Sequence, residues 1–65
     1  MNTAKTTAAR TLDGIEAGRR DYEKCNTPDD VSWFQRVAFD HLSAATTASE
    51  RAFFNGYLHS VGGVA

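Results

Sequence analysis

The chain has 65 residues, a formal net charge of −1 and a hydrophobic content of 42%. A domain of about 60 residues buries only about 60% of the surface that its unfolded chain exposes, so we expect one helical domain over residues 1–65, with residues 1–6 disordered. A core this thin argues against a deep substrate cavity, and a charge this close to zero argues against binding through many phosphate contacts.

The single cysteine, Cys25, cannot form an internal disulfide. Secreted domains of this size usually need several disulfides or a metal ion, so we expect a reducing, cytoplasmic location. The sequence contains no run of eighteen apolar residues, and its first residues lack the apolar stretch of a signal peptide. We therefore expect neither a membrane span nor a secretion signal.

Helical periodicity predicts a first helix over residues 7–25. Its apolar residues recur at spacings of three, four or their sums: Ala8, Leu12, Ile15, Tyr22 and Cys25. Gly14 and Gly18 each disfavour a helix interior by about 1 kcal/mol relative to Ala. Their spacing of four residues leaves a bare patch on one side, where a neighbouring helix or a partner could approach closely. The alternative is that both glycines only loosen a surface helix.

Four residues, Thr27-Pro28-Asp29-Asp30, mark the start of a second helix, which we expect over residues 28–45. Thr suits the N-cap, Pro suits the first helical position, and the Asp side chains suit the positive end of the helix dipole. Apolar side chains spread over about 240° of this helix, which predicts that it is the central one. Asn26 is expected to cap the first helix, and the short connection makes the two helices antiparallel.

A third helix is predicted over residues 48–61, because Thr47 and Glu50 fit the capping-box pattern and Gly62-Gly63 provides an end. The predicted fold class is therefore all-α, a compact three-helix bundle with helices at about 7–25, 28–45 and 48–61. The expected core comprises Phe34, Ala38, Leu42, Phe54, Tyr57 and Leu58, with Leu12 and Ile15.

Residues with catalytic or metal-binding chemistry are few: Cys25, Asp40, His41, Glu50 and His59. None of them shows a ligand spacing, so His41 is interpreted as a core-edge residue and His59 as a surface residue. Asp40, His41 and Ser43 are the residue types of a hydrolase triad, but neighbours on a helix point about 100° apart and cannot meet. We expect no catalytic residues, no metal ion and no cofactor.

A helix-turn-helix reading of DNA is disfavoured because the third helix carries only Arg51 as a fixed positive charge. Gly14-x-x-x-Gly18 and Gly56-Tyr57 resemble the spacing of glycines and aromatic residues in the ribosome modulation factor family. That resemblance implies a ribosome- or nucleic-acid-associated regulator. The family is strongly basic, whereas this chain is not.

In general character, the chain resembles the small helical inhibitors that bacteriophages and mobile elements encode against host defence complexes, the anti-CRISPR proteins among them. This resemblance implies a non-enzymatic inhibitor with a protein partner, a subunit of a nucleic-acid-binding defence complex, and no direct contact with nucleic acid or membrane. In such inhibitors, acidic side chains occupy positions on the defence complex where nucleic-acid phosphates bind. The acidic residues available for this role are Glu16, Glu23, Asp29, Asp30 and Asp40. The alternative for each is an ordinary solvated or helix-start charge.

A further alternative is a structural homodimer. In that arrangement the surplus apolar arc of the second helix, with Trp33 and Phe39, closes against a second copy.

Overall fold

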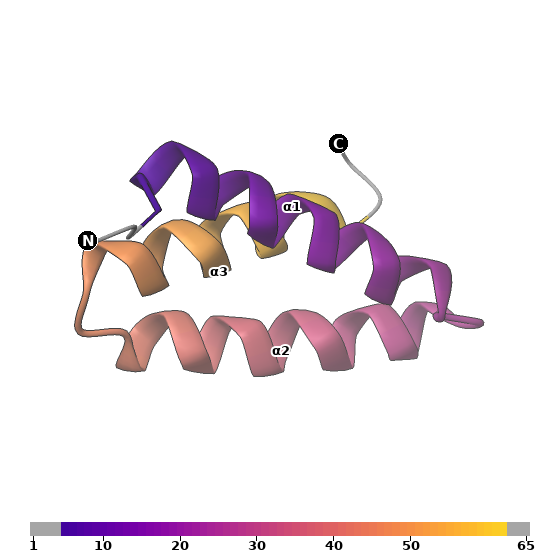
Figure 1. Cartoon of the computed structure of the whole chain (residues 1–65). Helices are drawn as coiled ribbons and strands as arrows, with labels where there is room; N and C mark the ends of the chain where they lie inside the picture. The colour runs from indigo at the N-terminus through magenta and orange to yellow at the C-terminus, as the bar shows by residue number, and fades with distance from the viewer. Residues whose placement is uncertain (1–4, 63–65) are drawn as a thin grey trace.

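The computed structural model describes residues 5–62 and contains three α-helices, with no strand in that range (Figure 1). They are α1 (Thr7–Glu23), α2 (Pro28–Ala44) and α3 (Ala48–Val61). The all-α prediction is confirmed, although α1 ends two residues earlier and α2 one residue earlier than expected. Residues 1–4 and Gly63 lie outside the described residues. Lys5 and Thr6, also expected to be disordered, are described, and Thr6 is the N-cap of α1.

The predicted capping box at Thr47 is present, and Thr27, predicted only as an N-cap, forms a second one. The Thr27 hydroxyl accepts a hydrogen bond from the Asp30 N–H (3.3 Å), and the Asp30 carboxylate accepts one from the Thr27 N–H (3.2 Å). Thr47 and Glu50 make the same reciprocal pair, at 3.1 and 3.3 Å. Each box satisfies backbone N–H groups that have no partner within the helix, which fixes where α2 and α3 begin.

The end of α1 differs from the prediction. Its C-cap is Lys24, in a right-handed conformation with φ −84° and ψ −11°, rather than Asn26. The Cys25 N–H closes the last turn on the carbonyl of Tyr22, at 3.0 Å. Asn26 instead donates its backbone N–H to Asp30, at 2.9 Å, and so belongs to the start of α2.

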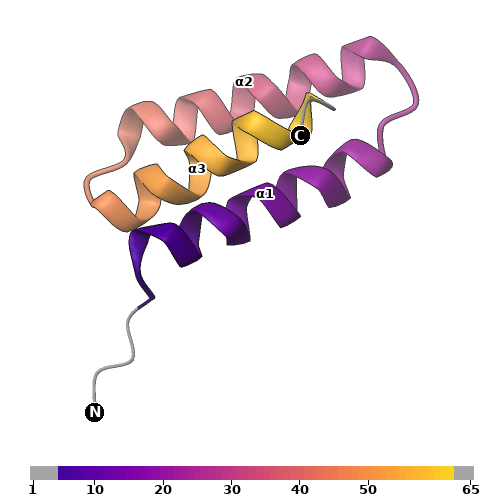
Figure 2. The same cartoon turned by 90° about the horizontal axis from the view of Figure 1, so that it is seen from above.

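The helix in the middle is α3. It packs extensively against α1 and less extensively against α2, whereas α1 and α2 have few contacts with each other. Figure 2 shows α3 lying between its two neighbours. The prediction that the second helix is central is therefore not supported. A broad apolar arc predicts two helical neighbours, but in the structure part of the arc of α2 faces solvent, including Trp33 and Phe39.

Small residues explain why α1 and α3 approach so closely. Gly14 and Gly18 of α1 and Gly56 of α3 are buried, and we call these three residues the glycine seam. A Cβ atom built on Gly14 would lie 1.8 Å from the carbonyl oxygen of Phe53. Across the seam, the Ser60 hydroxyl donates to the carbonyl oxygen of Ile15 at 2.7 Å. The expected bare patch on α1 therefore does receive a neighbouring helix.

The buried apolar residues are Ala38, Tyr57 and Val61, and Ala17, Phe34, Phe54 and Leu58 pack partly buried against them. Most of the predicted core is thus confirmed, with Ile15 and Leu42 half-buried. Leu12 was placed wrongly, because its side chain is 65% exposed. Since α1 turns its glycines toward α3, the apolar stripe through Leu12 and Tyr22 is rotated toward solvent.

Candidate functional site

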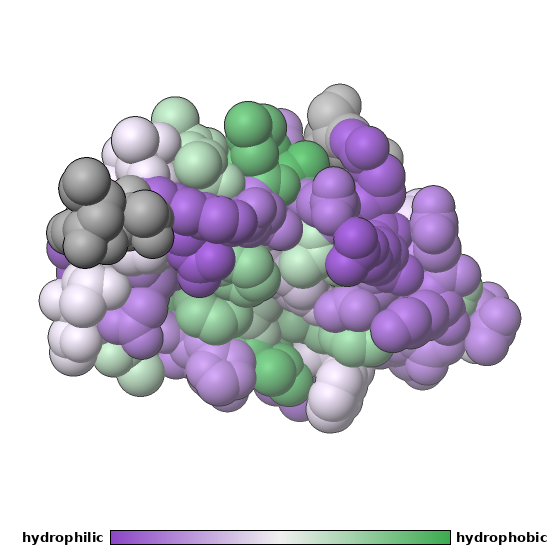
Figure 3. All heavy atoms as spheres, viewed as in Figure 1, coloured by the Kyte–Doolittle hydropathy of each residue, from purple (hydrophilic) through white to green (hydrophobic). Residues whose placement is uncertain are grey.

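A concave groove opens between α1 and α2, with α3 as its floor. It encloses about 300 Å³ and is lined by side chains from all three helices: Asp21, Trp33, Phe34, Val37, Ala38, His41, Phe53, Phe54 and Tyr57. We refer to it as the concave groove. Figure 3 shows hydrophobic side chains in the middle of one face of the molecule, beside hydrophilic ones. The groove exists because α1 and α2 both pack on α3 and hardly touch each other.

The wall that α2 contributes is aromatic. Trp33 is 59% exposed and packs edge-on against the ring of Phe34, with 5.2 Å between ring centroids. The His41 ring stacks on Phe54 at 5.1 Å, with only 8° between the ring planes. Phe53 in turn packs edge-on against Phe54. These contacts hold the apolar wall and floor in fixed relative positions.

The α1 side of the groove is polar. The Tyr57 hydroxyl donates a short hydrogen bond to the carboxylate of Asp21. Burial, followed by the hydrogen bond to Asp21 and its charge, raises the pKa of Tyr57 well above its usual value of 10. Tyr57 therefore remains a protonated donor at neutral pH and ties the floor of the groove to α1.

A charge cluster lies at the beginning of α1. The Arg10 guanidinium covers the ring of Phe53, 4.7 Å from its centroid, and donates to the Ser49 hydroxyl at 3.1 Å. Asp13 accepts from Lys5 at 2.7 Å and from Arg10 at 3.2 Å. The hydrogen bond from Lys5 is the largest of the effects that lower the pKa of Asp13. Arg10 therefore joins α1 to the start of α3, beyond the glycine seam.

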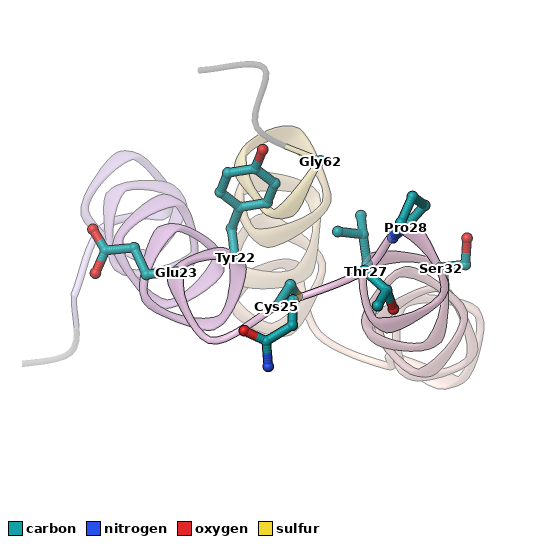
Figure 4. A pocket seen from close by; sticks show the side chains of 9 residues that line it. Tyr22, Glu23, Cys25, Thr27, Pro28, Ser32 and Gly62 are labelled. Carbon is teal, nitrogen blue, oxygen red and sulfur yellow. The ribbon is translucent and has the colours of Figure 1, made fainter.

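A second hollow, of about 710 Å³, lies at the connection between α1 and α2 (Figure 4). Its lining includes Tyr22, Cys25, Pro28 and Gly62. The Cys25 thiol donates to the carbonyl oxygen of Asp21 at 3.3 Å. Burial, and then the nearby carboxylates, raise the pKa of Cys25 above its usual value. Cys25 is half-buried, and a thiol with a raised pKa is a poor nucleophile at neutral pH.

The acidic residues predicted to bind a partner do not form one site. Glu16 and Glu23 are exposed on α1, and Glu16 accepts from Arg20 at 2.7 Å. Asp29 and Asp40 are exposed on α2. Because α3 lies between these two helices, the structure separates the α1 carboxylates from those of α2.

Within α2, the three acidic residues have different surroundings. The carboxylate of Asp30 is used in the capping box of α2. Asp29 and Asp40 are eleven residues apart, which places them about 20° apart around the helix, on one outward strip. Arg36 falls about 20° to the other side of Asp29, so this strip carries two acidic residues and one basic residue. Asp29 and Asp40 therefore share one exposed strip of α2 with Arg36.

Residues 5–62 contain no group of three or more His, Cys, Asp or Glu side chains arranged to hold a metal ion. In that same range, every helix is too short or too polar to cross a membrane. His41 and His59 are both exposed. Comparison of the chain with protein-family models, with curated proteins and with solved structures found no match.

Sequence analysis did not predict the concave groove, although the relevant signal was present. Gly14-x-x-x-Gly18 on the first helix is matched by Gly56-x-x-x-Ser60 on the third. Small residues at this spacing on two helices permit close backbone approach. Reading the two patterns together would have paired α1 with α3 and left the aromatic side of α2 open.

Proposed function

We propose that this protein is a non-enzymatic inhibitor that acts by binding another protein. The observation that carries the proposal is the exposure of large apolar side chains: 59% for Trp33, 60% for Phe39 and 65% for Leu12. The largest of these side chains, Trp33, lines the concave groove, and Trp is enriched among the residues that dominate binding energy. A chain with so thin a core leaves these residues outside, where a partner can cover them.

The resemblance to anti-CRISPR proteins supplies the particular class: an inhibitor in the cytoplasm of a host cell, bound to a nucleic-acid-binding defence complex. Asp29 and Asp40 support this choice, because they lie exposed on one strip of α2, with roughly 16 Å between them along the helix axis. Carboxylates spaced along a helix can meet Lys or Arg side chains that otherwise contact phosphates. Opposite charges across an interface mainly raise the association rate and make binding sensitive to salt.

Phage infection of bacteria with an active CRISPR–Cas system provides the test. We expect that expression of the protein restores plaque formation by a phage that the system targets. The double reversal D29K/D40K should abolish the restored plaque formation, while the variant retains the helical circular-dichroism signal. Its melting temperature must also be measured, because removal of Asp29 from the first turn of α2 costs about 0.3–1 kcal/mol.

The matched control is the double reversal E16K/E23K on α1, which lies on the other side of α3. Loss of activity in this control alone would assign the acidic contact to α1. Plaque formation that survives both reversals would contradict the acidic mechanism, and no restored plaques in strains covering the known CRISPR types would contradict the inhibitor. Salt-dependent binding of bare DNA or RNA would favour the alternative of a nucleic-acid-associated regulator.

A further inference from the structure

We draw no further inference here: the strongest candidate, the concave groove between α1 and α2 with the exposed side chain of Trp33 on its wall, carries none because nothing in the structure shows what covers it.

Discussion

Substitution of Gly14 by Ala tests whether the glycine seam holds α1 against α3. A real Cβ essentially never lies within 3.0 Å of another heavy atom, whereas the new one would lie 1.8 Å from the backbone oxygen of Phe53. The helices must therefore separate locally by at least 1.2 Å, the difference between these two distances. The hydrogen bond from Ser60 to Ile15, now 2.7 Å, would be stretched beyond its normal range.

The energies of these changes have opposite signs. Ala is favoured over Gly in a helix interior by about 1 kcal/mol. Overpacking costs about 1–3 kcal/mol, and loss of the hydrogen bond costs a further 0.5–1.5 kcal/mol or so. We expect a net loss of about 2 kcal/mol in the free energy of unfolding, from a total of about 3–10 kcal/mol for a chain of this length. This loss corresponds to a decrease of about 8–16 °C in melting temperature.

Thermal melting followed by circular dichroism measures the effect, with Gly62→Ala as the control. At Gly62 a Cβ would lie 3.0 Å from the amide nitrogen of the Gln35 side chain, which can move, and the backbone φ of −81° suits Ala. G62A should therefore melt within about 3 °C of the wild type. A G14A protein that melts at or above the wild-type temperature would refute the argument that backbone contact at the glycine seam sets how closely α1 packs against α3.

Three further substitutions test other parts of the fold. Leu12→Ala should change the free energy of unfolding by less than about 0.5 kcal/mol, because Leu12 is largely exposed. Phe34→Ala should lower it by about 2 kcal/mol, because Phe34 packs on the core. Equal midpoints of urea unfolding for the two variants would contradict the assignment of Phe34 to the core and of Leu12 to the surface. Glu50→Gln tests the capping box: hydrogen bonds from Thr47 and Thr46 lower the pKa of Glu50 below its usual 4.5. The ionised carboxylate therefore stabilises the fold above about pH 4.5, and this stabilisation is lost as the pH falls through the lowered value. E50Q should be less stable than the wild type at pH 7, and its stability should approach that of the wild type at pH 3. An equal loss of stability in E50Q at both pH values would refute the titration argument.

Local signals made the helix starts predictable, because each depends on residues adjacent in sequence. Thr27 with Asp30, and Thr47 with Glu50, satisfy backbone groups only three residues away. No knowledge of the tertiary arrangement is needed to recognise them. The same reasoning failed at Asn26, where the last turn of α1 closes through Lys24 and Cys25 without a left-handed residue.

The order of the helices was harder to predict, because apolar content does not reveal which backbones approach closely. The arc that includes Trp33 and Phe39 suggested two helical neighbours for α2. In the structure, Gly14 and Gly56 allow α1 and α3 to approach more closely than either approaches α2. This closeness draws α1 away from α2, opens the concave groove and moves Leu12 toward solvent. These consequences depend on residues about forty positions apart, which no local pattern reports.

The pairing of the first helix with the third also constrains how the chain folds. Because α1 and α2 have few contacts with each other, little tertiary structure can form during synthesis until α3 has been made. Closing the α1–α3 interface then confines the whole of α2 within a loop, an entropic cost that neighbouring-helix hairpins avoid. Folding should consequently be slower than for helical proteins dominated by local contacts. Gly56, which completes the glycine seam, and Ser60, which hydrogen-bonds across it, both lie late in the sequence, so the α1–α3 interface can close only when most of the chain is available.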